Sequence, residues 1–288
     1  MSDNRFHCRR HLLCELSFIL NYLPLFDMKN AFQLSLLLLG GAFLTLSSCK
    51  DDKQSSLPSC EGVHWEYSGD EGPDHWKDLC VDYTSCGGAA QSPIDITGAQ
   101  DDNSLAAITE HFVASTTHAV NNGHTVQFNC DAGSEITVDG QTYKLLQYHF
   151  HTHSEHTVGG VSYPMEVHFV HKNETTGKLA VVGVFFKEGA ENDFLKPFVE
   201  HLPASKDATF DDNNLTFNVS DCLPANRSYY TYGGSLTTPP CSEIVTWLVM
   251  EHPVEASHEQ IEAFHSVEHD NARPVQALGS RSLKHASL

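Results

Sequence analysis

Short segments in which apolar and polar residues alternate recur through most of the chain, and turn-forming residues separate them. The clearest are residues 124–129, 135–138, 144–151, 165–171, 179–187 and 243–250. Alternation at a period of two predicts β-strands with one buried face, and Asp139-Gly140 predicts a tight hairpin turn that returns along residues 141–146. Because the connections are too short for crossover helices, we expect mainly antiparallel pairing. The chain should form a β-dominated α+β fold.

Helical patterns occupy only two segments, residues 192–201 and residues 257–266. Ser257 is a candidate N-cap for the second, and Glu259 and Glu262 follow it in the first turns. From residue 60 onward there is no linker, repeat or low-complexity segment, so we expect a single domain with a few short peripheral helices.

The beginning of the chain has a different composition, and we expect it to lie outside the folded domain. Residues 28–48 combine a lysine, an apolar run and small residues, which is typical of a secretory signal peptide. The Leu-Ser-Ser before Cys49 resembles a bacterial lipobox, which predicts lipidation of Cys49. Residues 1–27 then precede the true start, residues 49–60 form a polar tether, and residues 61–288 form the domain. The alternatives are an ordinary cleaved signal peptide and a buried apolar strand.

The segment after Cys49 and the cysteine pattern both indicate export. Lys50-Asp51-Asp52 resembles the export signal of surface lipoproteins in Gram-negative bacteria, so we expect a periplasmic or cell-surface lipoprotein that contacts the membrane only through its lipid. Three of the nine cysteines lie in the leader, and the other six are Cys60, Cys80, Cys86, Cys130, Cys222 and Cys241. An even number in an exported chain predicts disulfides, with fifteen pairings possible.

The formal net charge of −20 excludes one class of partner. No basic stretch is present that could neutralise the phosphates of a nucleic acid. The apolar fraction of 40% is sufficient for a hydrophobic core. These values predict a soluble domain that does not bind nucleic acid.

Four histidines fall within the ten residues QYHFHTHSEH, which begin at Gln147. On a strand, His149 and His151 share one face about 6.6 Å apart and could converge on one metal ion, whereas His153 lies about 13 Å from His149. A third ligand should therefore come from a neighbouring strand. We expect His153 and His156 to take no part.

Residues 164–171 (PMEVHFVH) could supply this neighbouring strand. Glu166 and His168 share one of its faces and His171 lies on the other, so His168 and His171 cannot both be ligands. Glu166 is suited to accept the second N–H of His168, and Gln147 is suited to do the same for His149.

Four further stretches accompany these two. In order, the six are SPIDI (92–96), NNGH (121–124), QYHFHTHSEHT (147–157), EVHFVH (166–171), SLTTPPC (235–241) and NARPVQ (271–276). Together they resemble the alpha-class carbonic anhydrases, over about residues 63–281. The resemblance implies a large, twisted, mainly antiparallel sheet with zinc as the cofactor. It also implies reversible hydration of carbon dioxide to bicarbonate and a proton, by attack of zinc-bound hydroxide.

The resemblance also implies roles for individual residues. His149, His151 and His168 correspond to the zinc ligands, with acceptors for their other nitrogens at Gln147, at Glu166 and at the backbone carbonyl of Asn271. Thr237 corresponds to the residue that accepts a hydrogen bond from the hydroxide and donates its own proton to Glu155. Thr238 corresponds to a residue that helps to hold bicarbonate.

Proton transfer, substrate binding and one disulfide follow from the same resemblance. His124 corresponds to the residue that passes protons to buffer, with waters ordered by Tyr67, Asn122 and Gln127. An apolar substrate wall is implied at Val170, Val181, Leu236, Val245 and Trp247, and Thr237 is implied to contact the substrate as well. Cys86 and Cys241 match a disulfide of bacterial and secreted members, and pairing among the other four cysteines stays open.

Two alternatives remain for the function. One is a catalytically inactive carbonic anhydrase-like binding module, although such modules typically lose zinc histidines that this chain keeps. The other is ester hydrolysis at the same metal as a side activity; no Gly-x-Ser-x-Gly sequence supports a serine esterase.

Overall fold

The structure, a computed structural model, describes residues 57–288. The expected signal peptide over residues 28–48, the preceding residues 1–27 and the lipidated Cys49 lie outside the described residues. Within residues 57–288, no helix has both the length and the apolar character that a membrane span requires.

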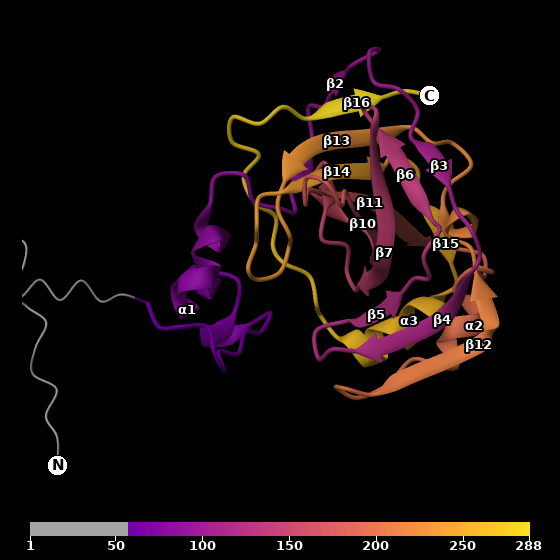
Figure 1. Cartoon of the computed structure of the whole chain (residues 1–288), viewed down its shortest axis with the longest axis horizontal. Coiled ribbons are helices and arrows are strands. Elements are labelled where there is room, and N and C mark those ends of the chain that lie inside the picture. Colours follow the sequence, from indigo (N-terminus) through magenta and orange to yellow (C-terminus); the bar gives the residue numbers. More distant parts are fainter. Residues whose placement is uncertain (1–56) are drawn as a thin grey trace, which may run out of the picture. The chain divides into compact units, whose positions relative to one another are not determined.

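A large sheet of 13 strands dominates the fold (Figure 1). Its main path runs through β12 (Thr209–Phe217), β4 (Ser115–Asn121), β5 (Val126–Asn129), β7 (Gln141–His151), β10 (Met165–Lys172), β11 (Leu179–Glu188), β14 (Val245–Met250), β13 (Tyr229–Gly234), β16 (Lys284–Ala286) and β2 (Gln100–Asp101). Beside this path lie β3 (Thr109–His111), β6 (Glu135–Val138) and β15 (Val254–Ala256). A small second sheet contains β1 (Asp95–Ile96), β8 (Thr157–Val158) and β9 (Val161–Ser162). The predicted β-dominated fold is confirmed.

Most neighbouring strands of the large sheet are antiparallel, as the alternating pattern predicts. The exceptions are the parallel pairs β11–β14, β11–β15 and β16–β2. The chain between β11 and β14, residues 189–244, contains β12 and β13. This connection is long enough to bring the chain back in the same direction, so the premise of short connections fails here.

Helices are short and peripheral. They are η1 (Gly69–Glu71), α1 (Trp76–Leu79), η2 (Val81–Gly87), α2 (Lys196–Val199), η3 (Val219–Cys222) and α3 (His258–Glu268). Ser257 caps α3 in a reciprocal capping box with Gln260. The other predicted helix, residues 192–201, is reduced to the single turn of α2.

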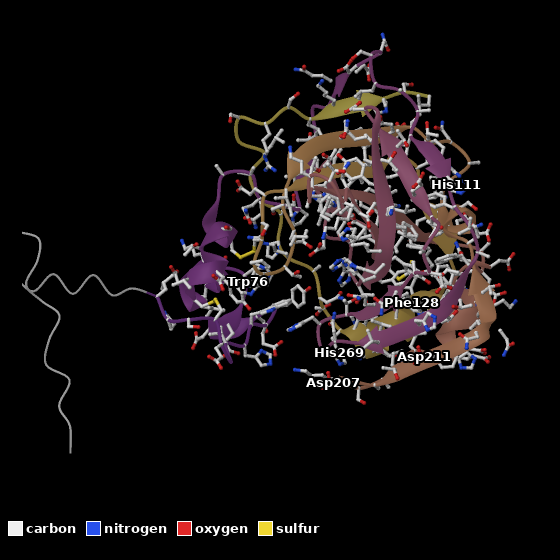
Figure 2. All side chains as sticks on the ribbon, viewed as in Figure 1. Trp76, His111, Phe128, Asp207, Asp211 and His269 are labelled. Carbon is white, nitrogen blue, oxygen red and sulfur yellow. A yellow bond between two sulfur atoms is a disulfide. The ribbon has the colours of Figure 1, made fainter. Side chains whose placement is uncertain are left out.

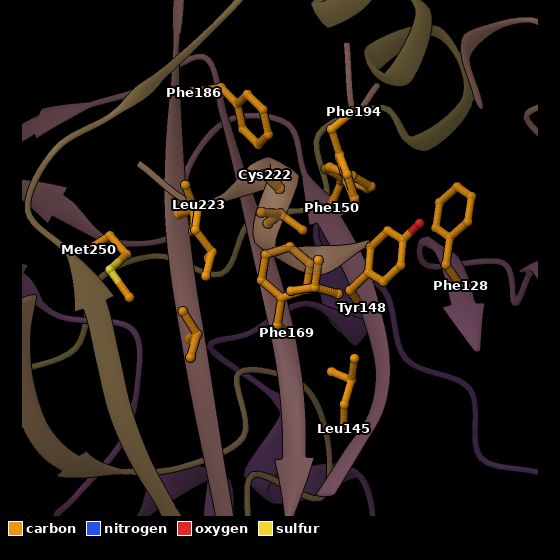
Figure 3. Close-up of a cluster of buried hydrophobic side chains, with 14 of the residues drawn as sticks. Phe128, Leu145, Tyr148, Phe150, Phe169, Phe186, Phe194, Cys222, Leu223 and Met250 are labelled. Carbon is orange, nitrogen blue, oxygen red and sulfur yellow. The ribbon is translucent and has the colours of Figure 1, made fainter. Parts of the chain in front are cut away.

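Strands β7 and β10 separate two environments. On one face, Tyr148, Phe150 and Phe169 enter a large apolar core (Figure 3). Tyr148 stacks on Phe128 in this core, with ring centres 4.8 Å apart. The residues between them carry the histidines to the opposite face, because successive side chains alternate along a strand.

Two disulfides fasten the N-terminal part of the domain. Cys60 pairs with Cys80, which answers the pairing that the sequence left open, and Cys86 pairs with Cys241, the pairing that the resemblance implied. Figure 2 shows disulfides as yellow bonds near Trp76, which packs against the Cys86–Cys241 pair. Cys130 and Cys222 are both free thiols, so the even number of cysteines does not lead to complete pairing.

Candidate metal centre and its surroundings

Three histidines meet on the polar face of β7 and β10. In the antiparallel register of the two strands, His168 lies opposite His149, and His151 follows two residues later on β7. One ring nitrogen of each histidine lies within 4.8 Å of those of the other two. The neighbouring strand that the sequence argument called for is therefore β10, and it brings His168 beside His149 and His151.

The two histidines of β7 have one nitrogen each engaged by an oxygen. His149 Nδ1 donates to Gln147 Oε1 at 2.9 Å, and His151 Nδ1 donates to the Asn271 carbonyl oxygen at 2.8 Å. Because these oxygens can only accept, both neutral rings carry their proton on Nδ1. Their Nε2 atoms therefore keep a free lone pair. Burial and the neighbouring histidines hold the pKa of His149 well below its usual value, which favours this neutral form.

His168 is oriented in the opposite sense. Its Nε2 donates to Glu166 Oε1 at 2.9 Å, so that Nδ1 is the nitrogen left free. Burial disfavours the charged ring, but the adjacent Glu166 outweighs burial and raises the pKa of His168. The three free nitrogens are thus Nε2, Nε2 and Nδ1, each on a ring fixed by an oxygen acceptor.

Glu166 is fully buried and lies at the centre of a hydrogen-bond network. Its Oε2 accepts from the backbone N–H groups of Glu155 and His156, and its Oε1 accepts from the rings of His156 and His168. Although burial alone would raise it, the two histidines hold the pKa of Glu166 well below its usual value. Four donors on one carboxylate require the ionised form.

The expectation that His156 takes no part is wrong. Its ring is fully buried, it lies 2.8 Å from Glu166, and its other nitrogen is joined to the Tyr232 hydroxyl at 2.7 Å. The Tyr232 hydroxyl in turn donates to Ser92 Oγ at 3.0 Å. His156 lies after the end of β7, where period-two alternation no longer determines its direction. His153 is exposed and lies 3.6 Å from Asp270, away from this network.

Glu155 is buried, and its two oxygens have different surroundings. Oε1 accepts from the backbone N–H of Arg273 at 2.9 Å. Oε2 lies 3.4 Å from His151 Nε2 and 3.8 Å from His168 Nδ1, with no hydrogen-bond partner in the described part of the chain. The carboxylate therefore faces two of the three free nitrogens.

Thr237 lies in a buried loop that is fixed on both sides. Trp247 Nε1 donates to the Ser235 carbonyl oxygen at 3.1 Å, and the Cys86–Cys241 disulfide follows the loop. The hydrogen bond expected from Thr237 to Glu155 is not formed within residues 57–288. Arg273 holds one oxygen of Glu155, and the other turns toward the imidazoles. Thr238 uses its carbonyl to accept from Cys241 N at 2.9 Å.

The residues expected to form an apolar wall do come together. Val170, Val181, Val245 and Trp247 belong to one buried cluster, and the partly buried Leu236 packs against it. The Trp247 ring lies edge-on to His168, with ring centres 4.8 Å apart. The histidine site therefore has an apolar side on β10, β11 and β14.

His124 lies among aromatic side chains from the N-terminal segment. Its ring stacks on Trp65, with centres 3.7 Å apart and planes at 9°, and Tyr67 lies 6.4 Å away. Its Nδ1 is buried and has no partner within the described residues. Burial lowers the pKa of His124. The charges of His64 and Lys206 lower it further, whereas the charge of Glu66 raises it.

The other two residues expected to order water make local contacts. Asn122 Oδ1 accepts from the backbone N–H groups of His124 and Thr125. Gln127 lies opposite His149 in the β5–β7 register, and its Nε2 donates to Asn129. Neither side chain forms a direct hydrogen bond to Tyr67 within the described residues.

Sequence reasoning missed Trp65, Tyr232 and Ser92. Trp65 stacks on His124, which lies 59 residues further along the chain. Tyr232 is hydrogen-bonded to His156, 76 residues away, and donates to Ser92, 140 residues away. No periodicity connects them to the histidines. The only available signal is that Ser92 and Tyr232 lie within or close to the stretches 92–96 and 235–241.

Comparison with known proteins agrees with this geometry. The family model for eukaryotic-type carbonic anhydrases matches residues 71–287. A carbonic anhydrase from Pectobacterium atrosepticum is 40% identical over 263 residues, which cover 90% of this chain and 100% of that protein.

Solved structures show the same similarity. The alpha-carbonic anhydrase from Thermovibrio ammonificans, in complex with the inhibitor sulfanilamide, is 44% identical with a TM-score of 0.74, over 77% of this chain and 99% of that one. The alpha-carbonic anhydrase from Photobacterium profundum is 42% identical with a TM-score of 0.72, over 76% and 99%. This chain therefore belongs to the alpha-carbonic anhydrases and is a carbonic anhydrase enzyme.

Proposed function

We propose that His149, His151 and His168 hold Zn²⁺ and that the chain uses it to hydrate carbon dioxide reversibly to bicarbonate and a proton. The observation that carries the proposal is the convergence of three imidazoles, each with one nitrogen held by an oxygen and the other close to those of its two neighbours. Three histidine ligands leave one coordination position open, as in catalytic rather than structural zinc sites.

The buried polar atoms fit a cation at this position. His151 Nε2 and Glu155 Oε2 lie 3.4 Å apart, and neither has a hydrogen-bond partner in the described part of the chain. Both are acceptors in the protonation states that their other contacts favour, so they repel each other unless positive charge lies between or beside them. When bound, zinc makes a water molecule acidic enough to serve as a nucleophile near neutral pH, for which carbonic anhydrases are the standard example.

The protein side chains supply orientation, substrate binding and proton transfer. Gln147, Glu166 and Asn271 fix the three rings so that their lone pairs converge. The apolar wall around Val181 and Trp247 suits a small, uncharged, linear substrate. Thr237 and Thr238 offer hydroxyl groups beside that wall to hold bicarbonate.

His124 is proposed to carry the proton from the site to buffer. Its ring is half-buried, and a histidine titrates close enough to neutrality to accept and release a proton in each cycle. Tyr67, Asn122 and Gln127 are proposed to order the water between His124 and the three histidines.

Metal content and carbon dioxide hydration test the proposal together. We expect one zinc per chain, hydration that is lost with a chelator and restored by zinc, and loss of both metal and activity in His151→Ala. His153→Ala is the matched control, because His153 lies two residues away but is exposed, and it should keep both. A zinc-loaded protein without measurable hydration in stopped flow would instead support an inactive binding module.

We also propose that residues 28–48 direct export and that Cys49 carries the lipid anchor. The two disulfides fit an exported protein. Mass spectrometry of the membrane fraction should find a lipidated Cys49 at the mature N-terminus, and Cys49→Ser should release active protein from the membrane. An unmodified N-terminus at another residue would contradict the anchor.

A further inference from the structure

Glu268, the last residue of α3, is a buried carboxyl group that the proposed reaction does not use. Its exposed fraction is 7%. Burial raises the pKa of Glu268 to about 8, and the C-terminal end of a helix also disfavours negative charge. An apolar side chain would avoid both costs, so the filling of space does not explain this carboxyl group.

One oxygen of Glu268 holds the start of β5. Oε1 accepts from the backbone N–H of Val126 at 3.0 Å and lies 3.2 Å from the Thr125 hydroxyl. These two residues directly follow His124, whose carbonyl oxygen lies 3.2 Å from Asn271 Nδ2. Glu268 and Asn271 therefore hold three consecutive residues of the segment that carries His124.

Asn271 makes a matching set of contacts with the end of β7. Its carbonyl oxygen accepts from His151 Nδ1 at 2.8 Å, and its Oδ1 accepts from Thr152 N at 2.9 Å. Its Nδ2 donates to the Phe150 carbonyl oxygen at 3.0 Å. Asn271 is fully buried. The direction of the His151 ring therefore depends on the position of Asn271.

Glu268 connects these two sets of contacts. Its Oε2 accepts from Asn271 Nδ2 at 3.3 Å, so that one oxygen contacts Asn271 and the other contacts the start of β5. The helix ends directly after Glu268, because His269 adopts a left-handed conformation with φ of 56°. Asn271 thus lies beyond the helix and is held by the contacts of its side chain.

We propose that Glu268 is a positioning residue of the enzyme, which acts through Asn271 to fix His151 and the segment of His124 relative to each other. This inference rests on the proposed function, which assigns His151 to the metal and His124 to proton transfer. Within the described residues, Glu268 forms no hydrogen bond to either imidazole. It acts only on the chain segments that carry them.

Zinc affinity, measured by competition with a chelator, tests the contact with Asn271. Glu268→Ala should bind zinc about tenfold more weakly, because the His151 ring loses its fixed direction. Glu268→Gln keeps the shape and one acceptor oxygen, so it should fold and show a smaller but measurable loss. Wild-type affinity in both variants would overturn the role of Glu268.

The matched control is Gln260→Ala, near the other end of α3. Gln260 is also buried, and its side chain forms hydrogen bonds with Asn192 and Ser257. This variant should destabilise the helix but keep wild-type zinc affinity at temperatures where every variant is folded. An equal loss of affinity in Gln260→Ala and Glu268→Ala would indicate a general effect of helix stability and would overturn the positioning role.

A double variant tests whether Glu268 acts through Asn271. Asn271→Ala removes the side chain but keeps the backbone carbonyl that accepts from His151. If Glu268 acts through this side chain, the double variant Glu268→Ala, Asn271→Ala should bind zinc no more weakly than Asn271→Ala alone. Additive losses of affinity would contradict the path through Asn271.

Turnover of the zinc-loaded protein tests the contact with the segment of His124. Glu268→Ala should lower kcat in weak buffer about two- to fivefold, and added imidazole should restore it. The ratio kcat/KM, which reports the hydration step, should change less. A loss in kcat/KM without a loss in kcat would contradict this contact.

The wild-type protein separates the two proposals. If wild type hydrates carbon dioxide normally and Glu268→Ala matches it in zinc affinity and kcat, only the role of Glu268 is overturned. If zinc-loaded wild type shows no hydration, the proposed function is overturned, and the comparison of zinc affinities still decides whether Glu268 positions His151.

Discussion

The two faces of β7 and β10 carry the same strand geometry but opposite chemistry. One face presents Tyr148, Phe150 and Phe169 to the apolar core, and the other presents His149, His151 and His168 to the site. The apolar face needs only volume and shape, whereas on the polar face one nitrogen of each histidine has a specific oxygen partner and the other nitrogen stays free. The core therefore holds the strands in register, and single hydrogen bonds then set the direction of each ring.

The largest expected effect on stability comes from a substitution on the apolar face alone. Phe150 is fully buried, and its ring lies 4.4 Å from that of Phe264 on α3. Phe150→Ala should lower the free energy of unfolding by about 3–5 kcal/mol, because a cavity replaces the ring. Denaturant melts should show this loss, while the molecules that remain folded should still bind one zinc. Loss of zinc from folded protein would show that the two faces are not separable.

Removing the charge at the centre of the polar face should affect both metal affinity and stability. Glu166→Gln replaces an acceptor of four hydrogen bonds by a group that accepts on only one atom. We expect roughly 10–100-fold weaker zinc binding and a loss of about 2–3 kcal/mol in unfolding free energy. Competition with a chelator measures the first and urea unfolding the second. Wild-type zinc affinity would contradict the assigned role of Glu166.

Glu268, at the end of α3, should make the free energy of unfolding depend on pH. It is buried and accepts from Val126 N, Thr125 Oγ1 and Asn271 Nδ2, yet burial raises its pKa from 4.5 to about 8. The folded protein therefore keeps this proton up to about pH 8, while the unfolded chain loses it near 4.5. Unfolding free energy should fall as pH rises between these values and stay level above them.

Glu268→Gln should remove this slope. The free energy of unfolding of the variant minus that of wild type should increase between pH 5 and pH 8, by on the order of a few kcal/mol. Urea melts at a series of pH values measure the difference. A difference that does not change with pH would contradict the raised pKa of Glu268.

The smallest effect concerns the partly exposed edge of the polar face. Gln147 only orients His149, so Gln147→Ala should weaken zinc binding by about tenfold and change stability by less than about 1 kcal/mol. Gln147→Glu, which keeps an acceptor at the same place, should restore most of the affinity. Equal affinity in the Ala variant would show that neighbouring contacts already fix the ring.

Prediction from sequence succeeded where local periodicity decides the outcome. The strand pattern at residues 135–138, 165–171 and 179–187 coincides closely with β6, β10 and β11, because a buried face imposes a period of two. The prediction that His168 and His171 lie on opposite faces of one strand is also confirmed. His171 is buried on the face opposite His168 and donates to the Phe169 carbonyl. The predicted helix 192–201 is shortened to one turn, Lys196–Val199, because so short a segment gains little from helix propagation.

Long-range contacts decided the remaining features. The parallel pairing of β11 with β14 depends on how residues 189–244 return to the sheet, and this has no local signature. The same holds for the Cys60–Cys80 pair, which formed while Cys130 and Cys222 remained free. The inclusion of His156 depends on where Glu166 presents its acceptors, and the missing hydrogen bond between Thr237 and Glu155 in the described residues depends on where Arg273 presents its backbone donor.

The sequence by itself determined that β7 and β10 would each have an apolar and a histidine-bearing face, because alternation is a property of the extended backbone. It also determined, through six ordered stretches, the family to which the chain belongs. Only the tertiary structure decided which nitrogen of each histidine stays free and which remote side chains surround the site. Those outcomes depend on hydrogen bonds between residues far apart in the chain, such as His151 and Asn271, whose geometry exists only once the sheet has formed.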